Sequence, residues 1–201
     1  MFMPSLRSLT APLASVVLVA SLSGCGINSV PTAEETVKAR WADVQNDYQR
    51  RADLIPNLVA TVKAAGAQEK DILVQVTQAR AAANQVQVSG EQLTDPAKVQ
   101  QFERAQNAVT MSLQRLQEAY PELKSQGNYT TLMSQLEGTE NRIAIARRDY
   151  NEAVQQYNTR IRTFPDAIGA RIFYGAKPVT PFAATTPGAD RAPTVNFGNA
   201  S

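Results

Sequence analysis

Cys25 is the residue whose chemistry decides most about this chain, because it is the only cysteine among 201 residues. It ends the run Leu-Ser-Gly-Cys at positions 22–25, directly after an apolar stretch that begins at Ala11. A thiol can form a stable thioether with a lipid, and no second cysteine is present to form a disulfide. The apolar stretch is shorter than the roughly 20 residues that a membrane-spanning helix needs. With Arg7 before it and small residues after it, the stretch has the pattern of a cleaved secretory leader.

The sequence around Cys25 resembles the bacterial lipobox, in which the thiol is diacylated, the chain is cut before the cysteine and the new amine is acylated. This resemblance implies a lipoprotein signal peptide over residues 1–24 and a lipidated tether over residues 25–31. Several acyl chains anchor a protein stably in a membrane, whereas a single chain binds only marginally. An Asp in place of Gly26 would resemble the inner-membrane retention signal, so we expect an outer-membrane lipoprotein facing the periplasm. A soluble secreted protein and a retained membrane anchor are the alternatives.

A second group of candidate residues surrounds a proline inside a helical pattern. Its members are Arg50, Arg51, Asp53, Pro56 and Asn57. Guanidinium groups form paired hydrogen bonds with phosphate and carboxylate. The group could therefore contact lipid phosphates or an acidic partner, or it could form an interhelical ion pair that braces a kink at Pro56. We favour the ion pair, with Glu69 or Glu140 as possible carboxylate partners. Arg147-Arg148 on the last predicted helix could likewise contact a phosphate or acidic partner or form an interhelical ion pair.

Candidates for catalysis or metal binding are few. The sequence contains no histidine, which removes the commonest general base and the commonest metal ligand. Asp43 and Asp47 share a helix face, but no third ligand or glycine turn accompanies them, so we expect them on a solvated face. No phosphate-binding loop, nucleophile elbow or zinc spacing is present. A net charge of +2 gives no electrostatic argument for a nucleic-acid partner. Since the sequence also lacks these catalytic and metal-binding patterns, we predict a protein without enzyme activity, cofactor, metal or nucleic-acid partner.

Apolar residues recur in steps of three and four within four segments, which predicts four amphipathic helices. The segments run from Thr32 to a break at Gly66, over 72–86, over 96–120 and over 129–163. A capping box is expected at residues 32–35. Pro56 predicts a kink, or a restart with Asp53 as N-cap, because proline lacks an N–H and clashes with the carbonyl four residues earlier. Residues 89–95 are expected to form a polar loop.

The helix starts and the far end of the chain carry further signals. Asp95-Pro96 predicts a helix start, and Gly127-Asn128 predicts a turn with an N-cap. Asn151 and Asn158 lie in the last apolar stripe, where a buried Asn can fix the register of a bundle. The apolar patch 171–174 is expected to dock on the bundle end. From about residue 183 the chain has little to bury, so we predict a disordered tail over 183–201.

Amphipathic helices with one apolar face are unstable alone and must pack together. Four of them joined by short loops predict an all-α fold, an antiparallel bundle of four helices over residues 32–182. In this prediction the first helix is kinked near Pro56, and a short C-terminal extension follows the last helix.

Three stretches resemble the LemA family of bacterial membrane-associated helical proteins. They are Trp41 with the run Arg-Arg-Ala-Asp-Leu-Ile-Pro-Asn-Leu-Val at 50–59, Thr77-Gln78-Ala79-Arg80, and residues 120–124 with 140–165. Gln68-Glu69 stands where members often carry His-Glu, which argues against a metal or acid–base role there. The resemblance implies a helical bundle on the far side of a membrane and no agreed biochemical activity.

These features together favour a lipid-anchored envelope protein that acts as a non-catalytic binding or scaffold module. It would contact the membrane through acylated Cys25 and bind an envelope protein that the sequence does not identify. The alternative is a self-associating structural envelope protein, with a homo-oligomer as its working form. A carboxylate-dependent hydrolase is a third and weaker hypothesis, because the sequence offers no nucleophile paired with a base.

Overall fold

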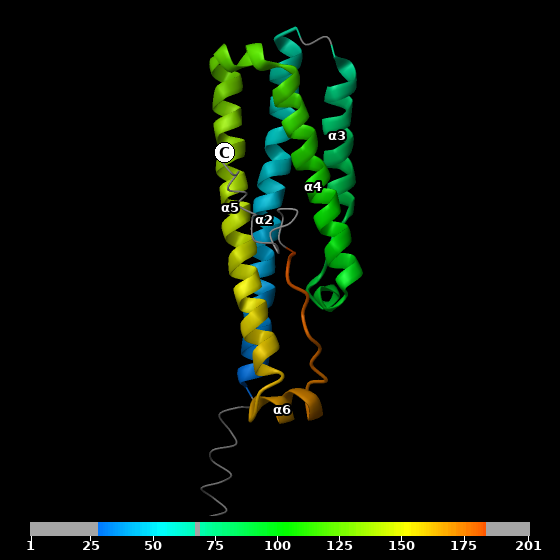
Figure 1. Cartoon of the computed structure of the whole chain (residues 1–201), viewed down its shortest axis with the longest axis vertical. Helices are drawn as coiled ribbons and strands as arrows, with labels where there is room; N and C mark the ends of the chain where they lie inside the picture. The colour runs from blue at the N-terminus through cyan, green and yellow to red at the C-terminus, as the bar shows by residue number, and fades with distance from the viewer. Residues whose placement is uncertain (1–27, 67–68, 184–201) are drawn as a thin grey trace, which may run out of the picture.

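The computed structural model describes residues 28–66 and 69–183, and over this part of the chain every regular element is helical. Five α-helices and two short 3₁₀ helices follow one another (Figure 1). They are α2 (Ser29–Ala64), α3 (Lys70–Gln85), η1 (Gly90–Thr94), α4 (Pro96–Ala119), η2 (Pro121–Ser125), α5 (Gly127–Arg160) and α6 (Asp166–Ile172). Helices α2 to α5 run alternately up and down the long axis of the molecule (Figure 1). The predicted all-α fold is confirmed.

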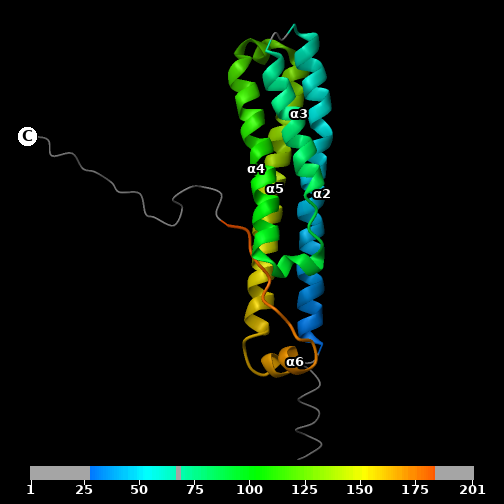
Figure 2. The same cartoon turned by 90° about the vertical axis from the view of Figure 1, so that its right-hand side faces the viewer.

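Two of the helices are much longer than the others. Helix α2 has 36 residues and α5 has 34, whereas α3 has only 16. At about 1.5 Å per residue, α2 and α5 form a pair of rods roughly 50 Å long. Helix α3 covers only the upper part of this pair (Figures 1 and 2). Below it, η1 and the final described segment, residues 176–183, complete the bundle, and we call this final segment the C-terminal strap.

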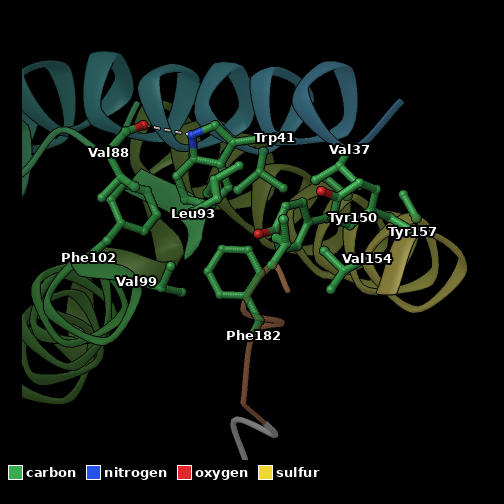
Figure 3. Close-up of a cluster of buried hydrophobic side chains, with 14 of the residues drawn as sticks. Val37, Trp41, Val88, Leu93, Val99, Phe102, Tyr150, Val154, Tyr157 and Phe182 are labelled. Atoms are coloured by element: carbon green, nitrogen blue, oxygen red, sulfur yellow. Dashed lines mark hydrogen bonds between the residues drawn. The ribbon is translucent and has the colours of Figure 1, made fainter. Parts of the chain in front are cut away.

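The lower core is built around a group of aromatic rings centred on Trp41 (Figure 3). The ring centroid of Trp41 lies 5.1 Å from Phe102, 5.4 Å from Tyr150 and 5.6 Å from Phe182. Its indole Nε1 donates a hydrogen bond to the carbonyl of Val88 at 2.8 Å. A second, aliphatic cluster fills the upper half, with Ile55, Leu58, Val62, Val76, Leu116 and Leu136 among its members. Phe182 shows that the strap contributes to the core as the helices do.

Packing shifts several of the predicted helix starts. Helix α2 begins at Ser29 because Val30 is buried, so the helix extends a turn beyond the predicted start. Thr32 donates its hydroxyl to the carbonyl of Asn28 at 2.7 Å, so the predicted capping box is wrong and the predicted tether is helical from Ser29. At α5 the N-cap is Gln126, which makes Asn128 wrong as a cap. Asp95 is confirmed, because its Oδ1 accepts the N–H of Ala97 at 2.9 Å.

Of two predicted connections, one is confirmed and the other is wrong. Gly66 breaks the chain as expected and adopts a positive φ of 86°. The predicted polar loop at 89–95 is wrong, because Leu93 is fully buried and organises the segment into η1. Ser89 and Gln92 form a capping box at its start. Burial of one leucine therefore turns a polar-looking segment into a packed element.

Residues 171–174 lie at the end of the bundle as predicted, but Ile172 and Phe173 do not pack against it. Helix α6 lies across the end of the bundle where α2 begins (Figures 1 and 2), and it is Ala170 that is buried there. Ile172 and Phe173 remain 69% and 66% exposed. Ala183, where the tail was expected to begin, is hydrogen-bonded to Glu103 at 3.1 Å. Cys25, the predicted signal peptide and the predicted tail beyond Ala183 lie outside the described residues.

Candidate functional site

Helix α2 continues through Pro56, and a residue of α3 compensates for the missing N–H. The restart predicted at Asp53 is wrong, because α2 is one helix from Ser29 to Ala64. Proline cannot donate to the carbonyl four residues earlier, that of Ala52. Arg80 supplies the missing donor, with its Nε 2.6 Å from the Ala52 oxygen. The proline thus creates an interhelical contact, and a kink at this point stays a prediction.

Of the five candidate residues around Pro56, only one points into the bundle. Arg51 is 1% exposed, whereas the other four are exposed on the outer surface: Arg50, Asp53, Pro56 and Asn57. The carboxylate of Asp53 accepts a hydrogen bond from Gln49 one turn earlier at 2.7 Å. Asp43 pairs in the same local way with Arg40 at 3.3 Å. The structure therefore does not gather the five residues into one site.

Arg51 joins three helices through its guanidinium group. Nη1 donates to the Glu140 carboxylate at 2.7 Å and to the Thr110 hydroxyl at 2.8 Å. Nη2 donates to the backbone oxygen of Gln106 at 3.1 Å and to its side-chain oxygen at 2.8 Å. The guanidinium also lies 5.0 Å from the ring centroid of Tyr48. We call this set the Arg51 network, and it fixes α2 against both α4 and α5.

A second, largely buried ion pair joins α4 and α5 at a point nearer to the strap. Arg147 of α5 binds Glu103 of α4 at 3.0 Å, with side chains only 13% and 12% exposed. Burial raises the pKa of Glu103 above its usual 4.5, and this effect outweighs the opposing attraction of Arg147. Arg147 also donates to the carbonyl of Ala183 at 3.1 Å and lies 4.6 Å above the ring of Phe182. Together, Arg147 and Glu103 therefore hold the end of the strap against α4 and α5.

These two charge pairs lie along a surface groove between α4 and α5. The groove has a volume of about 770 Å³, with Arg51, Glu140 and Arg147 among the residues that line it. A second hollow of about 410 Å³ continues it toward η2 and shares Thr110, Gln114 and Glu140 with the first. The other residues that line the two hollows are amides and two methionines (Asn107, Gln117, Asn141, Asn151, Met111 and Met133), apolar side chains such as Leu136 and Ile143, and the charged Arg148 and Glu137. The two hollows together form one groove with a mixed polar and apolar lining, which we call the α4/α5 groove.

Two asparagines in the second half of α5, Asn151 and Asn158, hold the strap. Asn158 donates Nδ2 to the carbonyl of Val179 at 2.8 Å and accepts the Val179 N–H at 2.9 Å. Asn151 does the same with Phe182, at 3.1 and 2.8 Å. Because an asparagine amide can replace a peptide group, each gives the strap the two bonds that a neighbouring strand would give. Sequence reasoning missed this role, although two asparagines one heptad apart were the visible signal.

The observed molecule is a helical-bundle protein in which Arg51 and Arg147 join the helices through ion pairs with Glu140 and Glu103. The LemA family model matches residues 40–197, and the chain therefore belongs to the LemA family. No curated protein matches the chain. The match includes α2 from Arg40 onward, the whole α4/α5 groove and the strap. Over residues 28–66 and 69–183, no helix is long and apolar enough to cross a membrane.

Proposed function

We propose that this protein is a lipid-anchored module of the cell envelope that acts by binding another envelope protein. Acylated Cys25 would hold it in the membrane, and the preferred location is the outer membrane facing the periplasm. The α4/α5 groove is the observation that carries this proposal. The groove is open to the surface. Its largely buried arginines, Arg51 and Arg147, are already paired with Glu140 and Glu103 of the same chain.

The groove has the dimensions of a peptide site. Along α5 it extends from Met133 to Asn151, which corresponds to about 27 Å of helix. A partner helix or extended segment can lie in such a groove. Met111, 56% exposed, gives the surface an adaptable apolar side chain. Asn107 and Gln114 offer donors and acceptors, so an amphipathic segment with polar side chains is the partner that fits best.

The chemistry of the groove favours binding over catalysis. Glu140 is bound to Arg51, and an arginine cannot act as a base because it stays protonated. Among the described residues, no group of three or more His, Cys, Asp or Glu side chains could hold a metal ion. The described groove therefore offers recognition groups without a paired nucleophile and base.

Site-specific photo-crosslinking in cells tests the proposal. A photoreactive residue is placed at Gln114 in the groove or at Asn57 on the outer surface of α2, both of which are exposed. We expect a discrete adduct from the groove position and none from the control position. Met111→Arg should abolish the adduct by blocking the groove, whereas Thr77→Arg, on the exposed surface of α3, should leave it unchanged.

Two outcomes would count against this proposal. Equal adducts from Gln114 and Asn57 would show contact without recognition, and an adduct with a second copy of this chain would favour the self-associating structural protein. The anchor has its own test, in which Cys25→Ser should prevent incorporation of labelled palmitate. A Cys25→Ser protein that still resists a carbonate wash of the membranes would contradict lipid anchoring through Cys25.

A further inference from the structure

The end of the bundle that carries α6 exposes an unusual amount of apolar surface. Phe164 is 82% exposed, Ile168 53%, Ile172 69% and Phe173 66%. These four residues, which we call the α6 end-face, follow one another within ten positions of the sequence. Clustered exposed apolar residues mark sites of interaction with proteins or membranes, whereas scattered ones do not.

Helix α6 has the reverse of the usual amphipathic arrangement. A surface helix normally turns its large apolar side chains toward the core. In α6 it is the small Ala170 that is buried, at 2% exposure, while Ile168 and Ile172 face outward one turn apart. The helix therefore packs on the bundle through a small side chain and presents its large ones to the surroundings. This arrangement leaves an apolar face without a partner in the described chain.

The position of the end-face indicates what covers it. Arg160, at the end of α5, donates to the carbonyl of Ser29 at 3.3 Å, so the first residue of α2 lies at the same end of the bundle as α6 (Figures 1 and 2). Only residues 26–28 separate Cys25 from Ser29. Four peptide steps span at most about 14 Å. An acyl chain on Cys25 would therefore enter the membrane close to the end-face.

The charges at this end fit a lipid surface. Four basic residues lie at or next to it, and all are exposed: Arg160, Arg162, Arg171 and Lys177. Nearby acidic charge is smaller. Glu34 and Glu35 share the single Lys38, each at 2.9 Å, Glu91 lines a hollow together with Lys177, and Asp166 is half-buried, which leaves this end of the bundle with a small net positive charge. Apolar side chains surrounded by basic residues are typical of surfaces that lie in the headgroup region of anionic membranes.

We propose that the α6 end-face rests on the anionic bilayer that holds the acylated Cys25, so that the bundle stands end-on. The proposal takes the anchor from the proposed function. In this orientation α5 rises from the membrane, and the α4/α5 groove lies roughly 14 to 40 Å above it, as counted from Arg160 to Asn151 and Met133. The partner would then be met at a fixed height and not at the lipid surface.

Lipid quenching of an introduced tryptophan tests the orientation. The lipidated protein, purified from membranes, is reconstituted into vesicles of phosphatidylethanolamine and phosphatidylglycerol with bromine on shallow acyl positions. Phe173→Trp places an indole on the end-face, and Val74→Trp, at a 49% exposed site near the start of α3, is the matched control at the other end. The native Trp41 is 2% exposed in the core and gives the same background in both.

We expect Phe173→Trp to be quenched at least about two-fold more than Val74→Trp, because such surfaces insert roughly 5–10 Å. Replacing phosphatidylglycerol with phosphatidylcholine should weaken the quenching. Arg162→Ala and Arg171→Ala should each lower the equilibrium constant for docking about five-fold, the change that roughly 1 kcal/mol per basic residue implies. Equal quenching of the two indoles would overturn the proposal, as would quenching that ignores lipid charge.

Mass spectrometry of the peptide containing Cys25 separates this proposal from the proposed anchor. An acylated peptide together with equal quenching means that the anchor stands and the docking fails. An unmodified peptide together with selective quenching of Phe173→Trp means that the docking stands and the anchor fails. Crosslinks between copies through α6, without quenching, would assign the end-face to self-association and overturn the docking.

Discussion

Arg51→Ala should destabilise the bundle far more than the same change at the neighbouring Arg50. Arg51 is 1% exposed and donates four hydrogen bonds that join α2 to α4 and α5. Breaking a buried charge pair costs about 3–5 kcal/mol. The partner Glu140 has a side chain 40% exposed and can regain water, so we expect a value near the lower limit, about 3 kcal/mol. The exposed Arg50 should change the free energy of unfolding by no more than about 0.5 kcal/mol.

Variants of Glu140 separate the charge from the hydrogen bond. Glu140→Ala leaves the buried guanidinium with one partner fewer and should cost about 2 kcal/mol, whereas Glu140→Gln keeps an acceptor and should cost about 1 kcal/mol. The double variant Arg51→Ala with Glu140→Ala should be less destabilised than the sum of its single changes, with a coupling of about 1–3 kcal/mol.

Urea unfolding followed by circular dichroism measures these differences. The midpoint should shift while the slope with denaturant stays constant, since the surface exposed on unfolding hardly changes. An Arg51→Ala protein as stable as Arg50→Ala would refute the structural role of the network. Zero coupling between Arg51 and Glu140 would refute the ion pair as its main contact.

Three further predictions concern residues outside the Arg51 network. Arg80→Ala should lower the free energy of unfolding by about 1–2 kcal/mol, because it leaves the Ala52 carbonyl without a donor. In a Pro56→Ala protein the same change should cost much less, because residue 56 then has an N–H to donate. Equal costs of Arg80→Ala with Pro56 and with Pro56→Ala would contradict the compensation. Burial raises the pKa of Glu103, so the folded state binds this proton more tightly; the resulting stabilisation is complete below about pH 4.5 and is lost as pH rises through the folded pKa. Glu103→Gln does not titrate, so its stability relative to the native protein should rise in urea titrations as pH is raised from about 4.5. A difference that stays constant with pH would disprove this. The buried hydroxyl of Tyr129 has no hydrogen-bond partner among the described residues. Tyr129→Phe should therefore raise the free energy of unfolding by up to about 1 kcal/mol. A loss of stability in calorimetry would show that the hydroxyl has a partner.

The helices were predictable because their signal is local. Steps of three and four in the apolar residues place α3, α4 and α5 close to their observed bounds. Asp95-Pro96 identifies a helix start from two residues alone. The misplaced start of α2 has a tertiary cause, because burial of Val30 extends the helix beyond a pattern typical of a cap.

The strap and the site were harder to predict because their contacts join distant parts of the chain. Arg51 meets Glu140 across 89 positions, and Arg80 reaches the Ala52 carbonyl across 28. The sequence identifies Arg51 as a charged residue on a helix and Glu140 as a possible partner, but only packing distinguishes Arg51 from Arg50. Phe182 lies in a short extension without helical periodicity, so no pattern could place it in the aromatic core.

Occupancy of the α4/α5 groove in the native envelope is the most direct test of the proposed binding role. Gln114→Cys introduces a thiol in the groove, and Asn57→Cys introduces one on the outer surface; both positions are exposed. The rate of maleimide labelling is compared between intact envelopes and the purified protein. A bound partner predicts that labelling of Gln114→Cys slows in the envelope while labelling of Asn57→Cys does not. The same ratio of the two rates in both preparations would show an empty groove and contradict the proposal.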